Sequence, residues 1–197
     1  MENNRFDIAD LEACLRVLQA GGVILYPTDT VWGIGCDAAN EEAVQKIYRL
    51  KQRSDAKSML VLLADEAELS RYVTVPACAR TILKESAGDA TARPLTIIYP
   101  AAHGIAASLI AEDGSLGIRL TREAFTQALC RRLGRPIVST SANISGSPAA
   151  KIYSQIAAPI LSGVDYICHY RRDDETEQQP SKILKVTSAG EVTVIRE

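Results

Sequence analysis

Short apolar segments alternate with amphipathic segments along most of the chain, and this alternation limits the possible folds more than any other feature. Residues 23–26 form an apolar run closed by Pro27, which is typical of a buried strand. Residues 11–20 repeat leucine and cysteine at helical spacing and end at Gly21. Strands that alternate with helices favour a sheet with helical crossovers, so the sequence predicts the α/β class.

The same pattern predicts the order of the elements. Asp10 and Asn40 stand where the N-caps of the first two helices are expected, and Pro76 is expected at the first position of a later helix. Residues 27–39 are expected to form a loop, and the polar residues 169–180 a mobile loop rather than a domain boundary. Helices are predicted at 11–20, 41–50, 66–72, 76–87, 122–133 and 153–161, and strands at 23–26, 59–63, 95–99, 116–120, 136–139, 164–168, 183–186 and 192–195.

Length and composition bound the kind of protein. A chain of 197 residues buries about 70% of its unfolded surface, which suffices for one core but not for two ordinary domains. We therefore expect a single domain over residues 1–197. Five cysteines without a C-x-x-C pair and only two histidines argue against a disulfide framework and a metal site. No apolar run approaches the roughly 18 residues that span a bilayer, so we expect a cytoplasmic protein without a membrane partner.

The balance of charge implies that any anion site is local. The formal net charge is -2, with 22 basic and 24 acidic residues, so the field of the whole molecule does not attract polyanions. Residues 46–57 (KIYRLKQRSDAK) hold five cations and one acid. Lys51 and Arg53 lie where a helix passes into a loop, and from there they can project over the end of a sheet, where open α/β proteins bind ligands. Cations at a solvated helix C-terminus are the alternative explanation.

Polar residues also gather where other strands end. Residues 139–146 (STSANISG) follow a predicted strand and offer short donors to phosphate oxygens without burying another charge. Residues 27–33 (PTDTVWG) occupy a second junction between strand and loop. Arg119 stands inside an apolar strand, where it is either exposed at an edge or held to meet a carboxylate or phosphate. Each of the two loop segments, taken alone, also fits an ordinary turn.

Common catalytic signatures are missing from the sequence. There is no G-x-x-x-x-G-K-[ST] segment, and residues 33–35 (GIG) lack the third glycine of the dinucleotide-binding pattern. There is also no G-x-S-x-G segment. A P-loop enzyme, a Rossmann dehydrogenase and a serine hydrolase are therefore not expected.

Several of these segments, in their order along the chain, resemble the YrdC-type threonylcarbamoyl-AMP synthases in their single-domain form. The resemblance covers about residues 21–196 and rests on PTDTVWGIG, the K-x-R of Lys51 and Arg53, the GIR that ends at Arg119, STSANISG, the Pro-Ser at 180–181 and the terminal VIR. It implies an α/β fold with a twisted open mixed sheet and helices around a large concave cavity. It also implies a nucleotidyltransferase that makes threonylcarbamoyl-adenylate and pyrophosphate from ATP, L-threonine and bicarbonate.

The resemblance further implies a role for Mg²⁺ beside ATP, and a product used for the threonylcarbamoyladenosine modification of tRNA. Candidate partners are tRNA or double-stranded RNA and the threonylcarbamoyl-transfer proteins that act downstream. The expected catalytic residues are Lys51, Arg53, Ser141 and Asn143, with the first two neutralising phosphates and the last two donating to phosphate oxygens. The expected threonine-binding residues are Thr30, Arg119, Ser139 and Ser181, and the expected ATP-binding residues are Arg53, Lys57, Ser115, Ser141 and Arg196.

The chain departs from the family pattern mainly around the expected threonine site. Arg93 and Pro94 replace a usual Gly-Pro, and residues 171–179 (RRDDETEQQ) with Lys182 replace the glycines and threonine that usually flank the Pro-Ser segment. Trp32 stands for a usual tyrosine and Thr121 for a usual proline. These departures leave open a divergent synthase that uses another amine-bearing substrate.

A non-catalytic module of the same fold, binding double-stranded RNA or tRNA, is the alternative from a different class. The net charge and the aromatic content of 5% weigh against it, because binding to single strands usually needs stacking platforms.

Overall fold

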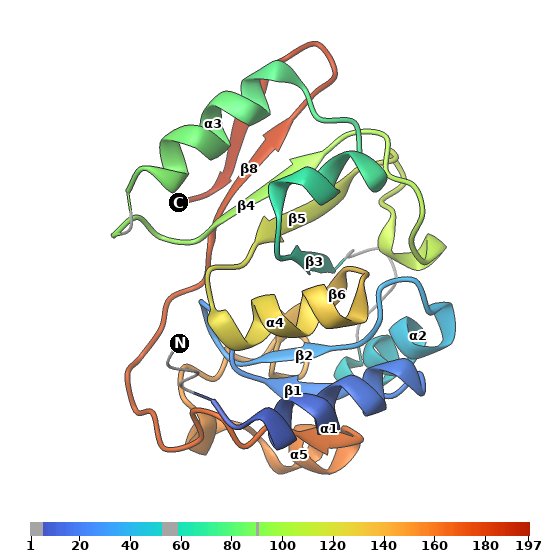
Figure 1. Ribbon diagram of the computed structural model, residues 1–197, viewed down its shortest axis with the longest axis vertical. Coiled ribbons are helices and arrows are strands. Elements are labelled where there is room, and N and C mark those ends of the chain that lie inside the picture. The colour runs from blue at the N-terminus through green and yellow to red at the C-terminus, as the bar shows by residue number, and fades with distance from the viewer. Residues whose placement is uncertain (1–5, 53–58, 90) are drawn as a thin grey trace.

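A computed structural model describes residues 6–52, 59–89 and 91–197 (Figure 1). The helices are α1 (Ile8–Gln19), α2 (Glu41–Lys51), α3 (Ala77–Ala87), α4 (Ala124–Leu133) and α5 (Ala158–Gly163), with 3-10 turns η1 (Glu66–Arg71), η2 (Ala107–Leu109) and η3 (Tyr153–Gln155). The strands are β1 (Ile24–Tyr26), β2 (Gly33–Gly35), β3 (Leu60–Leu63), β4 (Leu95–Tyr99), β5 (Leu116–Leu120), β6 (Ile137–Ser141), β7 (Tyr166–Ile167), β8 (Lys182–Val186) and β9 (Val192–Arg196).

The described strands form one mixed sheet in the order β7-β1-β2-β6-β3-β5-β4-β8-β9. The pairs β1·β7, β3·β5 and β4·β8 are parallel, and the remaining neighbours are antiparallel. The predicted α/β class with a mixed sheet is confirmed. Among the described residues, no helix has the length and apolar character that crossing a bilayer requires.

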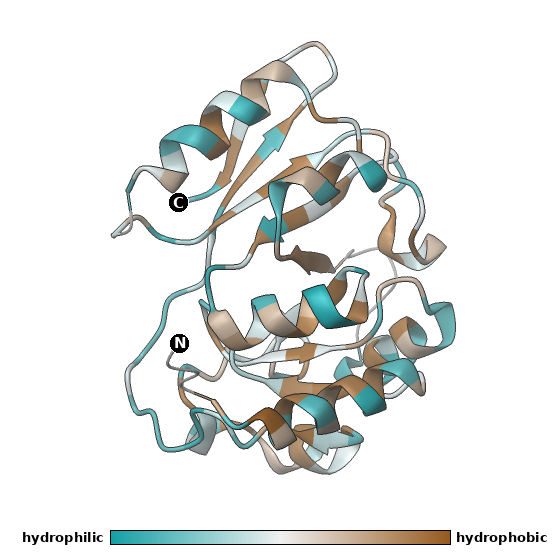
Figure 2. Cartoon of the chain, in the orientation of Figure 1, coloured by the Kyte–Doolittle hydropathy of each residue, from teal (hydrophilic) through white to brown (hydrophobic). Residues whose placement is uncertain are grey.

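Helices cover both faces of the part of the sheet around β1, β2 and β6. Ile24 and Ile137 face a core with α1 and α4, which lie side by side in Figure 1. The alternate residues Leu25 and Val138 face the other core, to which α2 contributes Ile47. This alternation follows from the period of two residues along a strand. Figure 2 shows β3 as hydrophobic between its neighbours, while hydrophilic and hydrophobic residues both appear along α4.

The start of α1 differs from the sequence prediction. The N-cap is Asp7, whose Oδ1 accepts a hydrogen bond from the N–H of Ala9 at 2.8 Å. The prediction that Asp10 is the cap was wrong, because Asp10 is buried and accepts hydrogen bonds from the backbone N–H groups of His169 and Tyr170, both at 2.9 Å. Burial alone would raise the pKa of Asp10, but hydrogen bonds from the Cys168 thiol, from these two backbone N–H groups and from the Tyr166 hydroxyl keep it below its usual value. Asp10 therefore ties α1 to the start of residues 169–180.

Five other local predictions can be compared with the structure. Asn40 is confirmed as the cap of α2, since its Oδ1 accepts from the N–H of Ala43 at 3.0 Å. Pro76 occupies the N-cap of α3 and not its first turn, residues 66–71 form a 3-10 helix, and residues 153–163 split into η3 and α5. The expected loop at 27–39 contains β2, which sequence reasoning missed. Glycine is a poor strand former, but a Cβ at Gly35 would lie 2.4 Å from the carbonyl oxygen of Val138.

Candidate active site

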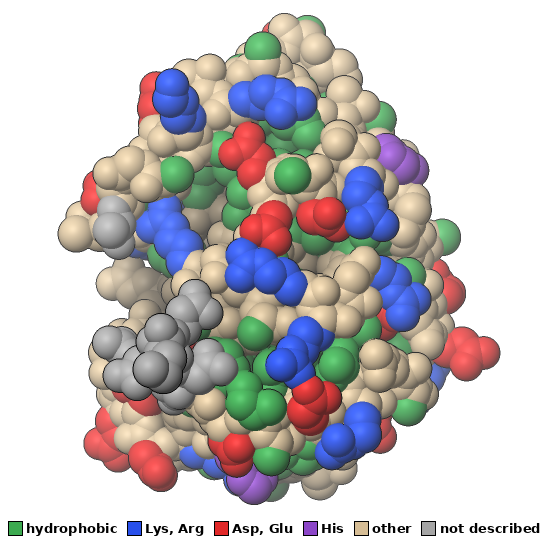
Figure 3. Space-filling model, in the orientation of Figure 1, with side chains coloured by type: hydrophobic (Ala, Val, Ile, Leu, Met, Phe, Trp, Pro, Cys, Tyr) green, Lys and Arg blue, Asp and Glu red, His purple; other side chains and the backbone are tan. Residues whose placement is uncertain are grey.

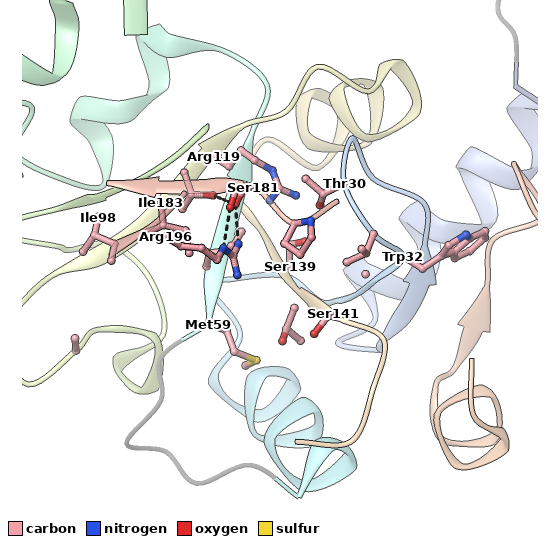
Figure 4. Close-up of a pocket in the computed structure, with 18 of the residues that line it drawn as sticks. Thr30, Trp32, Met59, Ile98, Arg119, Ser139, Ser141, Ser181, Ile183 and Arg196 are labelled. Atoms are coloured by element: carbon pink, nitrogen blue, oxygen red, sulfur yellow. Dashed lines mark hydrogen bonds between the residues drawn. The ribbon is translucent and has the colours of Figure 1, made fainter. Parts of the chain in front are cut away.

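A cavity of about 320 Å³ opens on one face of the sheet (Figure 4). Met59, Ile98 and Ile183 give it an apolar side. Its polar lining consists of Thr30, Thr96, Ser115, Arg119, Ser139, Thr140, Ser141, Ser181 and Arg196. The lining is thus rich in hydroxyl groups and arginines, and the described lining residues include no carboxylate.

Strand register explains why distant residues meet in this cavity. Arg119 on β5 lies opposite Thr96 on β4, and Thr96 lies opposite Ile183 on β8. Ile183 in turn lies opposite Arg196 on β9. Residues that oppose each other on neighbouring strands point to the same side of a sheet. One row across four strands therefore supplies a wall of the cavity, and a shift by one residue in any pairing would remove it.

Arg119 is buried in the centre of the sheet, at 3% exposure, so exposure at an edge is excluded. Its Nε lies 3.1 Å from Oδ1 of Asp29, whose side chain is also buried. The two atoms are poorly aligned for a hydrogen bond, so the contact is mainly one of charge. The other carboxylate oxygen of Asp29 accepts the backbone N–H of Arg122 at 3.0 Å. A buried guanidinium needs such a partner, because unpaired burial of a charge is costly.

Ser181 forms one end of the cavity and is held by three hydrogen bonds. Its hydroxyl lies 2.8 Å from Oγ1 of Thr96, and Nη2 of Arg196 donates to it at 3.2 Å (Figure 4). Nε of Arg196 also donates to the carbonyl oxygen of Ser181 at 2.9 Å. Burial lowers the pKa of Arg196, and the nearby cations Arg93 and Arg119 lower it further. The arginines around Ser181 therefore repel one another, and a bound anion would relieve that repulsion.

Ser141 forms the other end, in a turn that is supported from behind. The Ser141 hydroxyl donates to Oδ1 of Asn143, and Nδ2 of Asn143 donates to the carbonyl oxygens of Ile144 and Ser147 at 3.0 and 2.6 Å. The ammonium of Lys51 donates to the carbonyl oxygens of Ser141 and Asn143, the latter at 2.6 Å. Lys51, at the end of α2, thus meets the turn that holds two of the other expected catalytic residues, Ser141 and Asn143.

Thr30 and Ser115 are each held by a short local contact. The hydroxyl of Thr28 donates to the carbonyl oxygen of Val31 at 2.8 Å, so in the 3.0 Å contact between the two threonine hydroxyls Thr30 is the donor. The hydroxyl of Ser115 donates to Oδ1 of Asp113 at 2.6 Å. Hydrogen bonds from Lys185 and then from Ser115 lower the pKa of Asp113 to about 2.

The structure brings most of the expected site residues to one place. Thr30, Ser115, Arg119, Ser139, Ser141, Ser181 and Arg196 line the cavity. Lys51 and Asn143 lie behind the Ser141 turn and are not among the lining residues. Arg53 and Lys57 lie outside the described residues. The indole of Trp32 points away from the cavity in Figure 4, and its centroid lies 5.0 Å from that of the Tyr153 ring.

Sequence reasoning missed two residues of this site. Asp29 was part of the PTDTV segment but received no role, although a buried arginine in a strand calls for a carboxylate partner. Thr96 was passed over because the strand LTIIY is otherwise apolar. A lone hydroxyl in such a strand is a usable signal, since a buried polar group needs a hydrogen-bond partner.

One group of side chains elsewhere has the composition of a metal site. The potential ligand atoms of Asp10, Cys14 and Cys168 lie within 4.8 Å of one another. The Asp10 oxygens, however, already accept hydrogen bonds from two backbone N–H groups, the Tyr166 hydroxyl and the Cys168 thiol. The group therefore fits a structural role better than metal binding.

Comparisons with known proteins show which family this chain resembles. The Sua5/YciO/YrdC family model, described as "Telomere recombination", matches residues 16–197. A protein of Stenotrophomonas maltophilia named threonylcarbamoyl-AMP synthase is 36% identical over 186 residues, which cover 91% of this chain and 95% of that protein. A protein of the same name from Idiomarina loihiensis is 37% identical over 150 residues, covering 74% of this chain and 78% of that one.

Solved structures show the same fold. E. coli YciO superposes with a TM-score of 0.81 at 27% identity, covering 95% of this chain and 88% of YciO. P. abyssi Sua5 in a structure with L-threonine superposes with a TM-score of 0.80 at 21% identity, covering 93% of this chain. This chain spans only 52% of that Sua5 chain. The motifs, the sheet and these matches lead to one conclusion: the chain belongs to the Sua5/YciO/YrdC family.

Proposed function

We propose that the chain is a threonylcarbamoyl-AMP synthase, which forms threonylcarbamoyl-adenylate and pyrophosphate from ATP, L-threonine and bicarbonate. The observation that carries this proposal is the convergence of residues expected for threonine and residues expected for ATP in one cavity. The two relatives named threonylcarbamoyl-AMP synthase, at 36% and 37% identity, support it. In this proposal residues 1–197 act as one domain and the reaction is a nucleotidyl transfer.

Arg119 is the proposed partner of the threonine carboxylate. Its Nε faces Asp29, and its guanidinium end lies toward Thr30 in Figure 4. A guanidinium fixed on one edge can present its other donors as a fork to a carboxylate. Thr30, Ser139 and Ser181 lie around the same space and offer hydroxyls for the other polar groups of the amino acid.

Ser141, Ser115 and Arg196 are proposed to serve the nucleotide. In the reaction the threonine amine and bicarbonate first form a carbamate, with a new C–N bond and loss of water. An oxygen of this carbamate then attacks the α-phosphorus of ATP, forming a new P–O bond. The bond from that phosphorus to the bridging oxygen breaks, and pyrophosphate leaves with the electron pair. Donors and cations held in place before the reaction stabilise the charge that develops on the phosphate oxygens. Arg53 and Lys57 stay in the proposal as further cations for the phosphates.

Lys51 and Asn143 are proposed to act by fixing the turn that presents Ser141. The Lys51 ammonium donates to two carbonyl oxygens of the turn, and both amide hydrogens of Asn143 are used within it. Their hydrogen bonds thus set the position of the Ser141 hydroxyl. The charge of Lys51 also lies close enough to favour phosphate at the turn.

Mg²⁺ is proposed to accompany ATP and not to be held by a site of the protein itself. Protein sites for Mg²⁺ usually supply one or two carboxylates beside the substrate phosphates. The described residues that line the cavity supply hydroxyls and arginines only. The ion would therefore arrive on the triphosphate, where it neutralises phosphate charge, and the roles given to the residues above do not depend on it.

The biological setting of the proposal is the modification of tRNA in the cytoplasm. The adenylate would pass to threonylcarbamoyl-transfer proteins that act on tRNA. Among the described residues on the face that Figure 3 displays, lysine and arginine side chains are mixed with aspartate and glutamate, without a continuous basic patch. This face does not favour the alternative of an RNA-binding module, which needs clustered cations.

A panel of amino acids tests the proposed function. The protein is incubated with ATP, Mg²⁺, bicarbonate and either threonine, serine, valine or no amino acid, and pyrophosphate release and adenylate mass are measured. We expect both signals with threonine and much weaker signals with the other amino acids. Activity with a different amine would support a divergent synthase, and salt-sensitive RNA binding without any adenylate would support the RNA-binding module.

A further inference from the structure

We propose that Arg93 is a positioning residue for the amino-acid side of the cavity, acting through Pro180 on Ser181. Nη2 of Arg93 donates to the carbonyl oxygen of Pro180 at 2.6 Å. On the next residue, Arg196 holds both the carbonyl oxygen and the hydroxyl of Ser181. Arg93, just before β4, and Arg196, on β9, thus fix two consecutive residues. The inference rests on the proposed function, because it assigns a role within that site.

Pro180 needs such a partner more than another residue would. Proline has no backbone N–H, so its carbonyl is the only backbone group through which Pro180 can be held by hydrogen bonding. On the other side of Ser181, Lys182 donates its N–H to the carbonyl oxygen of Pro94 at 2.9 Å. Arg93 and Pro94 together therefore clamp the chain on both sides of Ser181.

The segment that leads to Ser181 has little support of its own. Residues 169–180, all of which are described, contain no helix or strand. The segment is tied at its start by Asp10 and by Arg171, whose Nη1 donates to the carbonyl oxygen of Thr28 at 3.1 Å. Further along, Glu177 forms an exposed ion pair with Lys151. Beyond that pair, Arg93 is the next side chain with a described contact to the segment, immediately before Ser181.

The chain just before Arg93 is connected, through Arg122 and Asp29, to Arg119. The guanidinium of Arg122 donates to the carbonyl oxygens of Ser86 and Ala92, at 2.6 and 3.2 Å, and so fixes the chain just before Arg93. The backbone N–H of Arg122 donates to Asp29, which also faces Arg119. The clamp on Ser181 and the proposed carboxylate partner therefore share one anchor, which keeps their spacing constant.

The side chain of Arg93 is exposed, and this limits the size of its effect. A charge-assisted hydrogen bond near the surface is worth a modest amount, so its loss corresponds to about a 5- to 10-fold change in affinity. The effect should fall on threonine, because Ser181 is on the expected threonine side. On the nucleotide side, Ser141 and Ser115 have no described contact with Ser181 and should be spared, and Arg196 keeps its two hydrogen bonds to Ser181.

Steady-state kinetics of the full chain, measured with threonine and ATP varied separately, test this assignment. For Arg93→Ala we expect the KM for threonine to rise about 5- to 10-fold while kcat and the KM for ATP change less than about two-fold. Arg93→Lys, which keeps a cationic donor, should recover most of the loss. Arg132→Ala removes an exposed arginine that pairs with Glu12 and serves as the matched control without effect.

A double-mutant cycle with Ser181→Ala separates positioning from general loosening. If Arg93 acts through Ser181, Arg93→Ala adds little to the threonine KM of Ser181→Ala. Additive effects in the cycle, an unchanged threonine KM in Arg93→Ala, or equal rises for threonine and ATP would overturn the assignment. A wild-type protein that forms no adenylate would instead refute the proposed function, and the role of Arg93 with it, so the two failures are distinguishable.

Discussion

The two ends of the cavity both present a serine hydroxyl, but they are supported in opposite ways. At the Ser141 end a buried lysine, with 1% exposure, reaches into the turn from behind and bonds its carbonyl oxygens. At the Ser181 end, arginines bond the chain from the flank, and one of them, Arg196, also lines the cavity. Lys51, a cation of the K-x-R motif, holds a neighbouring turn in position through hydrogen bonds to its carbonyl oxygens. A cation in a motif can therefore position a neighbouring residue as well as neutralise a charged ligand.

The difference also predicts unequal sensitivity. The carbonyl oxygens bonded by Lys51 lie in a tight turn, and losing a buried donor leaves acceptors without partners. The Ser181 end has more than one partner for the same residue, since Thr96, Arg196 and the Arg93–Pro180 contact act in parallel. Changes at the Ser141 end should therefore be the more damaging ones.

Lys51→Ala should give the largest effect of these variants, and it tests the support of the Ser141 end of the cavity. We expect a loss of about 10²- to 10³-fold in threonine-dependent pyrophosphate release, because the turn that presents Ser141 loses two charge-assisted bonds. The free energy of unfolding should fall by about 2–4 kcal/mol, measured in urea. Lys51→Met keeps the apolar stem and serves to separate lost packing from lost hydrogen bonds. Undiminished release by Lys51→Ala would contradict this account of the turn.

Arg196→Ala tests the other end and should be less damaging. We expect a loss of about 10- to 100-fold in kcat/KM for threonine, since two of the three bonds to Ser181 disappear while Thr96 remains. Arg196→Lys should lie between the variant and the wild type. If Arg196→Ala proves more harmful than Lys51→Ala, the ranking of the two ends is wrong.

Thr96→Val tests whether the hydroxyl of Thr96 helps to hold Ser181. The substitution keeps the shape of the side chain but removes the hydroxyl 2.8 Å from that of Ser181. We expect the KM for threonine to rise about 3- to 5-fold with little change in kcat, corresponding to one lost hydrogen bond. Thr74→Val, a control outside the cavity lining, should leave the kinetics unchanged. A Thr96→Val variant with wild-type kinetics would remove Thr96 from the site.

Acid titration gives the smallest expected effect and concerns Asp113, which holds Ser115. Its pKa of about 2 lies below the usual 3.8, so its contribution to stability is present above about pH 4 and is lost as the pH falls through about 2. The difference in urea stability between wild type and Asp113→Asn should therefore shrink between pH 4 and pH 2. A gap that stays constant over this range would show that the carboxylate does not stabilise this corner as an ion.

The sequence was sufficient for those parts of the fold that depend on local pattern or on motif order. Alternating apolar runs predicted most strands, and Asn40 could be identified as a cap from its residue type and its place before an amphipathic run, which the hydrogen bond from the N–H of Ala43 to its Oδ1 confirms. Arg119 and Ser181 could be brought to one cavity because their motifs follow one another in a known order. Their meeting in the structure depends on strand register, which the motifs carry only implicitly.

The features that the sequence did not predict depend on contacts between residues that lie far apart in the chain. Asp7 and Asp10 are equally good caps by composition, and only the docking of residues 169–170 against Asp10 decides between them. The strand at 33–35 looks like a loop because it contains two glycines, and the need for glycine at position 35 becomes visible only when β6 is packed against it. Lys51 was expected to face phosphates, and its contacts with carbonyl oxygens become visible only once the turn is folded against α2.

Isotope tracing of the product tests the central claim, that a single cavity joins an amino acid to a nucleotide, most directly. Wild-type protein and Arg119→Gln are incubated with ATP, Mg²⁺, threonine and ¹³C-bicarbonate, and the adenylate is measured by mass spectrometry. The account predicts a threonylcarbamoyl-adenylate that carries a single ¹³C in the wild type and a large loss of it in Arg119→Gln. An adenylate without the label, or the same labelled yield from both proteins, would contradict it.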